Sequence, residues 1–221
     1  MKISQKRITQ WDYIREGVKF ETFIRESDMI LRSDEYIIVH LDGVKFTGKY
    51  YKKFSKENKK KVVEALSNVA KRLCEVYSST RIAYVYGDEI SIILEGAEVQ
   101  TNYHNRIQKL CSCIASQTSI YFQQELFKIH NGVFDELIQN CIFACKTYNL
   151  PKALIDSYMK WRLNCCKKMI FDRHEEFDNM EDWEKYGFLL TKKSNWNKRS
   201  IDFALKKFQN QPQNKFFELS E

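Results

Sequence analysis

Short apolar runs along the chain predict the strands of a sheet. The run at 36–41 is nearly continuous and rich in β-branched residues, which is typical of a strand buried on both faces. Further runs of this kind lie at 81–86, 90–94, 141–145 and 186–191. The turn dipeptide Gly87-Asp88 joins the second and third runs, which therefore predict a β-hairpin.

Longer segments keep the spacing of amphipathic helices. One covers 56–77, with Ser55 as its predicted N-cap, and another covers about 102–126. A further helix is predicted from Pro151 to about 170, because proline suits the first turn of a helix. The resulting order, β-α-β-β-α-β, is ferredoxin-like and is the core of polymerase and cyclase palms. The sequence therefore predicts an α+β fold, a ferredoxin-like polymerase palm (βαββαβ) with additional helices.

Length and composition favour one compact domain. The chain has 221 residues, 43% of them hydrophobic, with seven glycines and two prolines, which excludes a low-complexity chain. We expect a single palm-type domain over 1–221 with a helical extension over about 151–221, including a weak helix at 200–208. No secretory leader pattern and no apolar run near the ~18 residues of a membrane span is present, so no membrane contact is expected. Seven cysteines without zinc-binding spacing favour a reducing, cytoplasmic location.

Basic residues exceed acidic ones, 36 against 29, and they are clustered. Seven lysines lie within 49–61 and are interleaved with aromatic residues. A second cluster consists of Lys160, Arg162, Lys167 and Lys168, and a third lies at 192–199. Such clusters can neutralise phosphates, and aromatics among them can stack on bases, which favours RNA as a partner. Charge alone slightly favours the plainer alternative, a solvated helix face.

Two acidic turns follow predicted strands. Asp42-Gly43 ends the first strand, and Gly87-Asp88-Glu89 forms the hairpin tip. If the first strand neighbours the hairpin, the three carboxylates meet at one edge and repel one another unless a cation is bound. Such oxygen-rich clusters suit Mg²⁺, and two ions about 3.5–4 Å apart would clamp both the attacking and the leaving oxygen of a phosphoryl transfer. Either turn alone is most often an ordinary turn, but their joint placement favours a metal site.

Seven short segments carry a further signal. They are HLDGVKF at 40–46, KENK at 56–59, YGDEIS at 86–91, IASQ at 114–117, FACK at 143–146, YMKWRLNCC at 158–166 and WEKYG at 183–187. These segments resemble motifs of the tRNA(His) guanylyltransferase-like enzymes, the 3′–5′ RNA polymerases. In the same order, the family motifs are R-[LIV]-D-G-R-x-F-H, K-P-N-D, S-D-E-[YF]-S, a helix carrying A-S, F-D-x-R, Y-[FL]-x-W-R-x-x-D-C and W-x-[KR]-x-G. The similarity covers about 36–190 with gaps.

The resemblance implies a Mg-dependent nucleotidyltransferase that extends the 5′ end of tRNA, or of another 5′-monophosphorylated RNA, in the 3′–5′ direction. ATP or GTP would activate the 5′-monophosphate, and the 3′-hydroxyl of an incoming nucleotide would then attack it. Asp42, Asp88 and the backbone of Gly43 would bind two Mg²⁺ ions, with Glu89 as a third catalytic residue. A homo-oligomer, a tetramer, is implied as well.

The resemblance also implies a nucleotide site and RNA contacts. The nucleotide-binding residues would be Asp42, Gly43, Val44, Lys45, Phe46, Thr47, Gly87 and Asp88, with Lys56 and Asn58 on the phosphates. The RNA contacts would come from the cluster Lys160, Arg162, Lys167 and Lys168.

The chain departs from the family pattern at several positions. Val44 and Thr47 replace an arginine and a histidine, and Ala144 and Cys165 replace aspartates. These positions lie in RNA-recognition regions of the family, so the departures favour templated tRNA 5′-end repair over guanylylation of one particular tRNA. Two alternatives stay open. One is a palm-type nucleotidyl cyclase, because Gly87-Asp88-Glu89-Ile90 is close in form to G-G-D-E-F, and the other is an inactive RNA-binding palm.

Overall fold

The computed structural model describes most of the chain between 31 and 165 and part of it up to 200. The described residues are 31–103, 106–129, 132–155, 157–159, 161–162, 165, 180–181, 183–184, 187–191 and 197–200. The elements are β1 (Tyr36–Gly43), α2 (Phe46–Lys49), η1 (Tyr51–Lys53), α3 (Lys56–Val76), β2 (Thr80–Tyr86), β3 (Glu89–Glu95), α4 (Gly96–Tyr103), α5 (Ile107–Lys128), α6 (Asp135–Asn140), β4 (Phe143–Leu150), η2 (Lys152–Leu154), β5 (Phe188–Thr191) and β6 (Asn197–Ser200).

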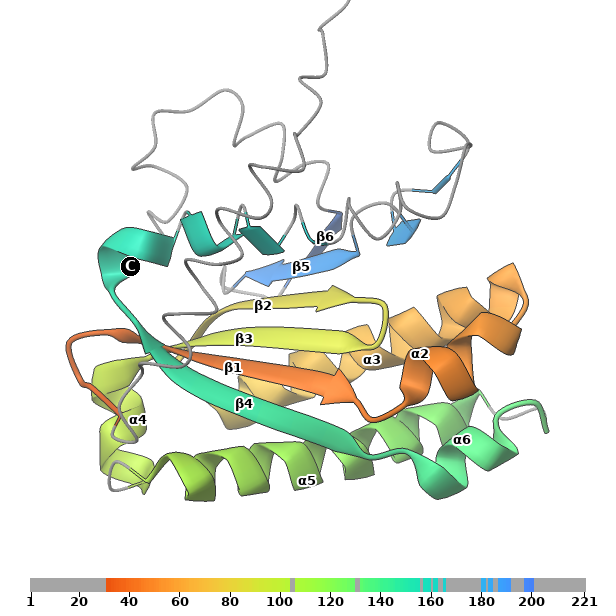
Figure 1. Ribbon diagram of the computed structural model, residues 1–221, viewed down its shortest axis with the longest axis horizontal. Helices are drawn as coiled ribbons and strands as arrows, with labels where there is room; N and C mark the ends of the chain where they lie inside the picture. The colour runs from red at the N-terminus through yellow and green to blue at the C-terminus, as the bar shows by residue number, and fades with distance from the viewer. Residues whose placement is uncertain are drawn as a thin grey trace, which may run out of the picture.

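Within this part of the chain the strands form one six-stranded sheet, in the order β4-β1-β3-β2-β5-β6 (Figure 1). Every neighbouring pair is antiparallel. The four strands β4-β1-β3-β2, connected through α3 and α5, give the predicted ferredoxin-like palm. β5 and β6 extend the sheet beyond β2. The end of β1 and the β2–β3 turn lie at the same end of the sheet, next to α2 (Figure 1).

One face of the sheet packs against α3 and α5. Alternate residues of β1 (Ile37, Val39 and Leu41) are fully buried there, as the two-residue period of a strand requires. The inward stripe of α3 has helical spacing and consists of Val62, Leu66, Val69 and Leu73, each 0% exposed. Burying side chains of this size stabilises the fold by roughly 1.5–3 kcal/mol each, so this face supplies the main core.

The other face has two halves. One half is a second apolar cluster, in which Ile38, Tyr84 and Ile93 pack against Tyr158 and Met159 from the segment after η2. The other half is polar and lies further along the same strands, where His40 pairs with Ser91 and Asp42 pairs with Glu89 across β1 and β3. The alternation of the strands therefore places the polar residues together at one end of this face.

Some boundaries differ from the predicted ones. The single helix expected at 102–126 is two helices, because Arg106 has an extended conformation (φ −89°, ψ 99°) between α4 and α5. The strand expected at 141–145 begins at Phe143 and continues to Leu150, since it pairs with all eight residues of β1. Residues 166–170 of the predicted third helix and 201–208 of the weak one lie outside the described residues. Among the helices that the structure describes, none combines the length and apolar character needed to cross a membrane.

Candidate active site

The predicted meeting of the two acidic turns is confirmed. β1 lies directly beside β3, and the register places Asp42 opposite Glu89. At the end of the ladder the Gly43 N–H donates to the Asp88 carbonyl oxygen at 3.2 Å. The chain thus ties the Asp42-Gly43 turn to the hairpin tip by backbone hydrogen bonding, so the three carboxylates share one edge of the sheet.

Three residues give the two turns and the start of α2 their backbone conformation. A Cβ atom at Gly43 would lie 2.8 Å from the Cβ atom of Phe46, closer than real Cβ contacts allow, so only glycine fits between β1 and α2. Gly87 has φ +58° at the hairpin tip, a conformation that costs glycine little. Lys45 has the same φ of 58° without being a glycine, and this left-handed residue turns the chain into α2.

Thr47 positions the carboxylate of Asp88. Its backbone N–H and its hydroxyl both donate to Oδ2 of Asp88, at 3.2 and 2.9 Å. Burial, followed by the neighbouring Asp42 and Glu89 carboxylates, raises the pKa of Asp88 to about 6, although the Thr47 hydrogen bond opposes the rise. Thr47 therefore fixes the orientation of a carboxylate that lies close to two others.

Asp42 lies on the open face among charged neighbours. Burial, followed by the Glu89 carboxylate opposite, raises the pKa of Asp42, while Lys146 and Arg162 oppose that rise. Arg162 forms an ion pair with Glu89. Arg162 is only 7% exposed, so its positive charge neutralises Glu89 from a buried position. Among the described residues, no arginine forms such an ion pair with Asp42 or Asp88.

His40 is partly buried and is hydrogen-bonded within the sheet. Its Nδ1 lies 3.1 Å from the hydroxyl of Ser91 on the neighbouring strand. Burial and the nearby cations of Arg162 and Lys146 lower the pKa of His40 to about 3, so the ring is neutral at physiological pH. It therefore adds no positive charge next to the carboxylates.

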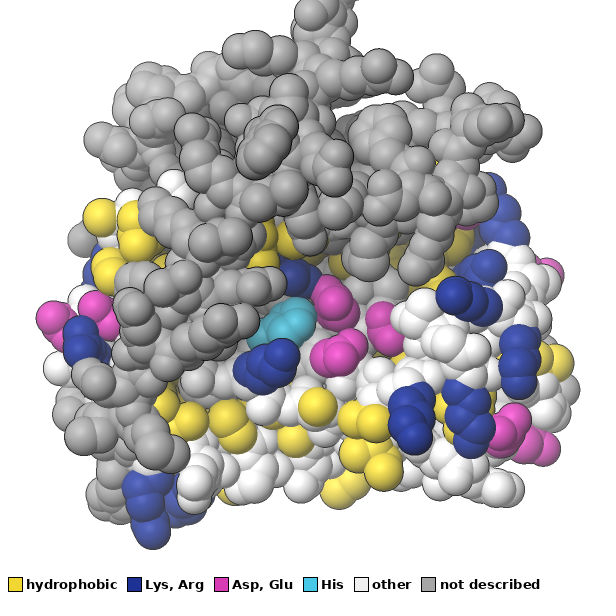
Figure 2. Space-filling view, viewed as in Figure 1, with side chains coloured by type: hydrophobic (Ala, Val, Ile, Leu, Met, Phe, Trp, Pro, Cys, Tyr) yellow, Lys and Arg dark blue, Asp and Glu magenta, His cyan; other side chains and the backbone are white. Residues whose placement is uncertain are grey.

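Figure 2 shows acidic side chains gathered beside a histidine in the middle of the open face, with basic side chains next to them. No group of three or more His, Cys, Asp and Glu side chains among the described residues is arranged to hold a metal ion. The predicted ligand set has a different make-up, since it combines two carboxylates, Asp42 and Asp88, with the backbone carbonyl of Gly43. All of these donors are oxygens, which is the chemistry that Mg²⁺ prefers.

The predicted nucleotide-binding segment 44–47 divides into exposed and buried residues. Val44 is 44% exposed and Lys45 is exposed as well, and the Val44 N–H donates to the carbonyl oxygen of Ile142 at 2.9 Å. Phe46 is 2% exposed and packs against Phe122 of α5 in the main core. The side chain of Phe46 therefore anchors α2, and only its backbone is placed to line a nucleotide.

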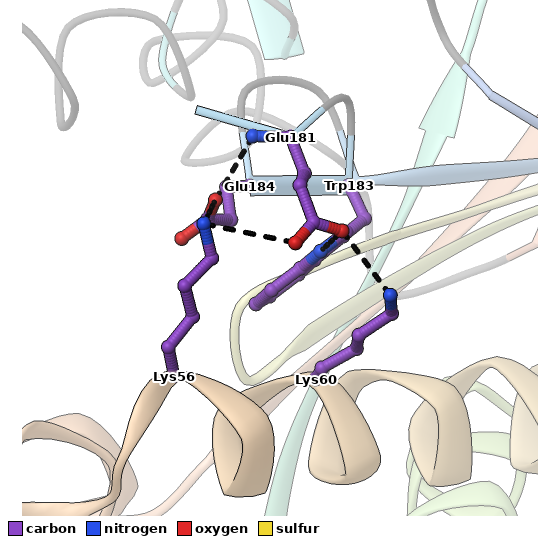
Figure 3. A network of polar contacts seen from close by, with 5 residues as sticks. All are labelled: Lys56, Lys60, Glu181, Trp183 and Glu184. Carbon is purple, nitrogen blue, oxygen red and sulfur yellow. Dashed lines mark hydrogen bonds and ion pairs between the residues drawn. The ribbon is translucent and has the colours of Figure 1, made fainter. Parts of the chain in front are cut away.

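Lys56, a predicted phosphate contact, is paired with acidic residues of the late segment (Figure 3). Its ammonium lies 2.8 Å from Glu184 and 3.7 Å from Glu181, and Lys60 lies 3.1 Å from Glu181. The indole N–H of Trp183 donates to Glu181 at 2.9 Å. Any phosphate bound by Lys56 would have to exchange with these carboxylates. Lys56, Lys60 and Glu181 are exposed, so their ion pairs can exchange at little cost, whereas the Glu184 side chain is only 17% exposed.

The other predicted contacts have mixed outcomes. The backbone N–H of Asn58 donates to the Ser55 hydroxyl at 3.2 Å, which confirms Ser55 as the N-cap of α3. Arg162 is buried against Glu89 instead of standing on the surface. The remaining predicted RNA contacts, Lys160, Lys167 and Lys168, lie outside the described residues.

Two site residues were missed from the sequence. Lys146 lies on β4 directly opposite His40, one step along the strand face from Asp42. The period-two alternation of β4 could have placed it there once the pairing with β1 was known. Ile142 contributes only a carbonyl oxygen, for which no side-chain pattern exists.

A family model described as Thg1, tRNAHis guanylyltransferase, matches residues 17–151, more than half of the chain. The chain belongs to the tRNAHis guanylyltransferase (Thg1) family. Members of this family are nucleotidyltransferases that act on tRNA and use nucleoside triphosphates. This protein is accordingly a nucleotidyltransferase of the family.

Solved structures of Thg1 proteins share the fold. A bacterial tRNA(His) guanylyltransferase (Thg1)-like protein in complex with GTP matches with a TM-score of 0.69 and 20% identity, over 92% of this chain and 99% of that one. A bacterial Thg1-like protein in complex with ATP matches with a TM-score of 0.65 and 18% identity over the same shares. The tRNA(His) guanylyltransferase of Saccharomyces cerevisiae matches with a TM-score of 0.62 and 20% identity, over 86% and 95%. No curated protein matches significantly in sequence.

Proposed function

We propose that this Thg1-family protein adds nucleotides to the 5′ end of tRNA, or of a related 5′-monophosphorylated RNA, in the 3′–5′ direction. ATP or GTP would activate the RNA end, and the 3′-hydroxyl of the incoming nucleoside triphosphate would then attack it. One observation carries the proposal. Asp42 and Asp88, which are 46 residues apart in sequence, are held at one sheet edge by the Gly43–Asp88 backbone hydrogen bond. GTP and ATP bound to Thg1-like relatives support the choice of nucleotides.

The oxygen donors at this edge fit Mg²⁺. Two carboxylates and a carbonyl, from Asp42, Asp88 and Gly43, leave further positions for phosphate oxygens and water. The proposed ligand atoms are all oxygens, which agrees with a hard cation, and Nδ1 of His40 is hydrogen-bonded to Ser91. When bound, Mg²⁺ supplies charge neutralisation at the phosphates and aligns the two reacting oxygens.

The residues of the chain have separate tasks in this site. Thr47 keeps the Asp88 carboxylate in one orientation, because both of its donors meet the same oxygen. Arg162 cancels the charge of Glu89, so that the net negative charge facing the nucleotide comes from Asp42 and Asp88. Lys45 and Lys146, both exposed, stand next to this edge and would attract the triphosphate.

The RNA end, and not one particular tRNA, is the substrate that the site supports best. Ala144 lies directly opposite Asp42 on β4, at the position where the family pattern has an aspartate. The chain therefore presents a small apolar side chain at a position where an aspartate would add a further carboxylate. The presence of Ala144 leaves Asp42 and Asp88 unchanged but alters the surface beside them that an RNA end would contact. This difference favours templated 5′-end repair over recognition of tRNA(His). A homo-tetramer, implied by the resemblance, stays a prediction.

The decisive experiment is an incubation with Mg²⁺, labelled nucleoside triphosphates and a tRNA shortened at its 5′ end. Wild-type protein is expected to add label to the 5′ end, and Asp42→Asn is expected to lower the rate on the order of 10³-fold. The matched control is Asp34→Asn, an exposed aspartate before the opposite end of β1, which should retain the activity. A parallel reaction without RNA separates the alternatives. A new small nucleotide formed there would replace our proposal with a cyclase, and no product in either reaction would favour an inactive RNA-binding palm.

A further inference from the structure

Two cysteines and a threonine form a cluster between α5 and β4. The thiol of Cys111 on α5 donates to the hydroxyl oxygen of Thr147 on β4 at 3.0 Å. The sulfur of Cys145 lies 3.7 Å from the same oxygen. Both sulfurs therefore contact the same hydroxyl group. Both cysteines are partly exposed, so a small molecule can reach them.

The cluster lies on the opposite side of β4 from the nucleotide site. Cys145 and Thr147 alternate with Ala144 and Lys146 along the strand. The latter two share the open face with Asp42, whereas Cys145 packs with the main core under α5. The thiol pair is therefore separate from the carboxylates, and its chemistry can be tested independently of nucleotide transfer.

The two thiols differ in acidity. The neighbouring Cys145 thiol lowers the pKa of Cys111, and the Thr147 hydroxyl lowers it as well, against the opposing effect of burial. The partner Cys145 has its pKa raised by the neighbouring Cys111 thiol and by burial. A low-pKa thiolate beside a protonated thiol is the arrangement in which one sulfur attacks an oxidant and the other resolves the product.

We propose that Cys111 and Cys145 are a redox modification site that reacts with hydroperoxides to form a disulfide between α5 and β4. The Cys111 thiolate attacks one peroxide oxygen, the O–O bond breaks, and a sulfenic acid and, for hydrogen peroxide, water are formed. The Cys145 sulfur then attacks the Cys111 sulfur, the S–O bond breaks, and a second water leaves with the thiol proton. In total, two thiols and one peroxide give one disulfide and two waters.

Cys141 and Cys113 differ from this pair in burial and in position. Cys74 and Cys141 are buried, and burial raises the pKa of Cys141 to about 12. Cys113 is partly exposed and lies two residues from Cys111, about 200° around the same helix, so its sulfur faces away from β4. Cys113 is thus a matched internal control, since it shares the helix and the exposure of Cys111 without the partner thiol on β4.

The first test treats the reduced full chain with one equivalent of hydrogen peroxide, followed by non-reducing digestion and mass spectrometry. The expected product is a Cys111–Cys145 crosslink that is lost in Cys111→Ser and kept in Cys113→Ser. In Cys145→Ser, Cys111 should stop at the sulfenic acid, which a cyclic 1,3-diketone traps. If wild-type protein gives no Cys111–Cys145 crosslink, or gives crosslinks among all cysteines in equal yield, the proposal is wrong.

The second test measures alkylation of each cysteine by iodoacetamide from pH 5 to pH 10. Cys111 should react with a midpoint below the value of about 8.5 for an ordinary thiol, because its pKa is lowered. Thr147→Val removes the hydroxyl group that lies 3.0 Å from the Cys111 sulfur and should move the midpoint upward, and Thr147→Ser should restore it. A Cys111 midpoint equal to that of Cys113 would contradict the proposed thiolate.

Discussion

The two faces of the central sheet have opposite character, although the same strands form both. On the helix-covered face every residue of β1 from Ile37 to Leu41 that points inward is apolar and fully buried. On the open face the same strand passes from Ile38 through His40 to the exposed Asp42. Leu41 and Asp42 are therefore neighbours in sequence, yet one stabilises the fold and the other is available for chemistry.

This difference shows how the fold accommodates a charged cluster. The apolar half of the open face is covered by Tyr158 and Met159, so the sheet gains core on both sides there. In the polar half, His40 bonds to Ser91 and Glu89 pairs with Arg162. His40 and Glu89 thus have polar partners, and the carboxylates Asp42 and Asp88 lie at the end of the face. A site can be placed on such a sheet without loss of the main core on its other face.

The largest expected effect on stability comes from the helix-covered face. Ile92→Ala should lower the free energy of unfolding by about 2–5 kcal/mol, because Ile92 is fully buried and the change leaves a cavity. Urea denaturation measures this loss, and Ile142→Ala, which is 62% exposed, should stay within about 0.5 kcal/mol of wild type. Nucleotide transfer per folded Ile92→Ala molecule should be retained. A selective loss of activity without a loss of stability would contradict the separation of the two faces.

An intermediate effect is expected where the two halves of the open face meet. Arg162→Met should destabilise the protein by about 1–3 kcal/mol, because Glu89 then loses its cation while still partly buried. The double variant Arg162→Met/Glu89→Gln should recover part of this loss in the same denaturation experiment. Additive losses would show that Arg162 acts by packing alone, and not by neutralising Glu89.

The smallest expected effect is at Thr47. Thr47→Val keeps the shape and the backbone N–H but removes the hydroxyl donor to Asp88, a change of about 1 kcal/mol. We expect a severalfold lower rate of nucleotide transfer, while Thr47→Ser keeps the hydroxyl and should remain close to wild type. Equal rates for the valine and serine variants would show that the backbone donation alone positions Asp88.

Local patterns predicted much of the fold. The apolar runs of β1, β2 and β3 and the turn dipeptides placed Asp42 and Asp88 at strand ends, and the alternation of residues then fixes which of them share a face. The break between α4 and α5 was missed because helical spacing continues across it. β4 was predicted too short, since its later residues gain strand structure from pairing with β1 and not from their own apolar character.

The contacts that could not be predicted join distant segments. Arg162 and Glu89 are 73 residues apart, and Lys60 and Glu181 are 121 residues apart. In the sequence, each of these residues lies in a segment that reads as an ordinary exposed helix or turn. Only the tertiary fold brings their charges together. The same reason explains Phe46, which was expected at the nucleotide but packs into the core beneath α2.

The central claim is that Asp42 and Asp88 form one cation site. Mn²⁺ binding, measured by the decrease of the free-ion electron paramagnetic resonance signal, tests it in wild type, Asp42→Asn, Asp88→Asn and the double variant. If the carboxylates share the site, either single change should strongly weaken binding, and the double variant should bind no more weakly than the worse single one. Wild-type binding in both single variants, or independent losses that multiply in the double variant, would contradict the claim.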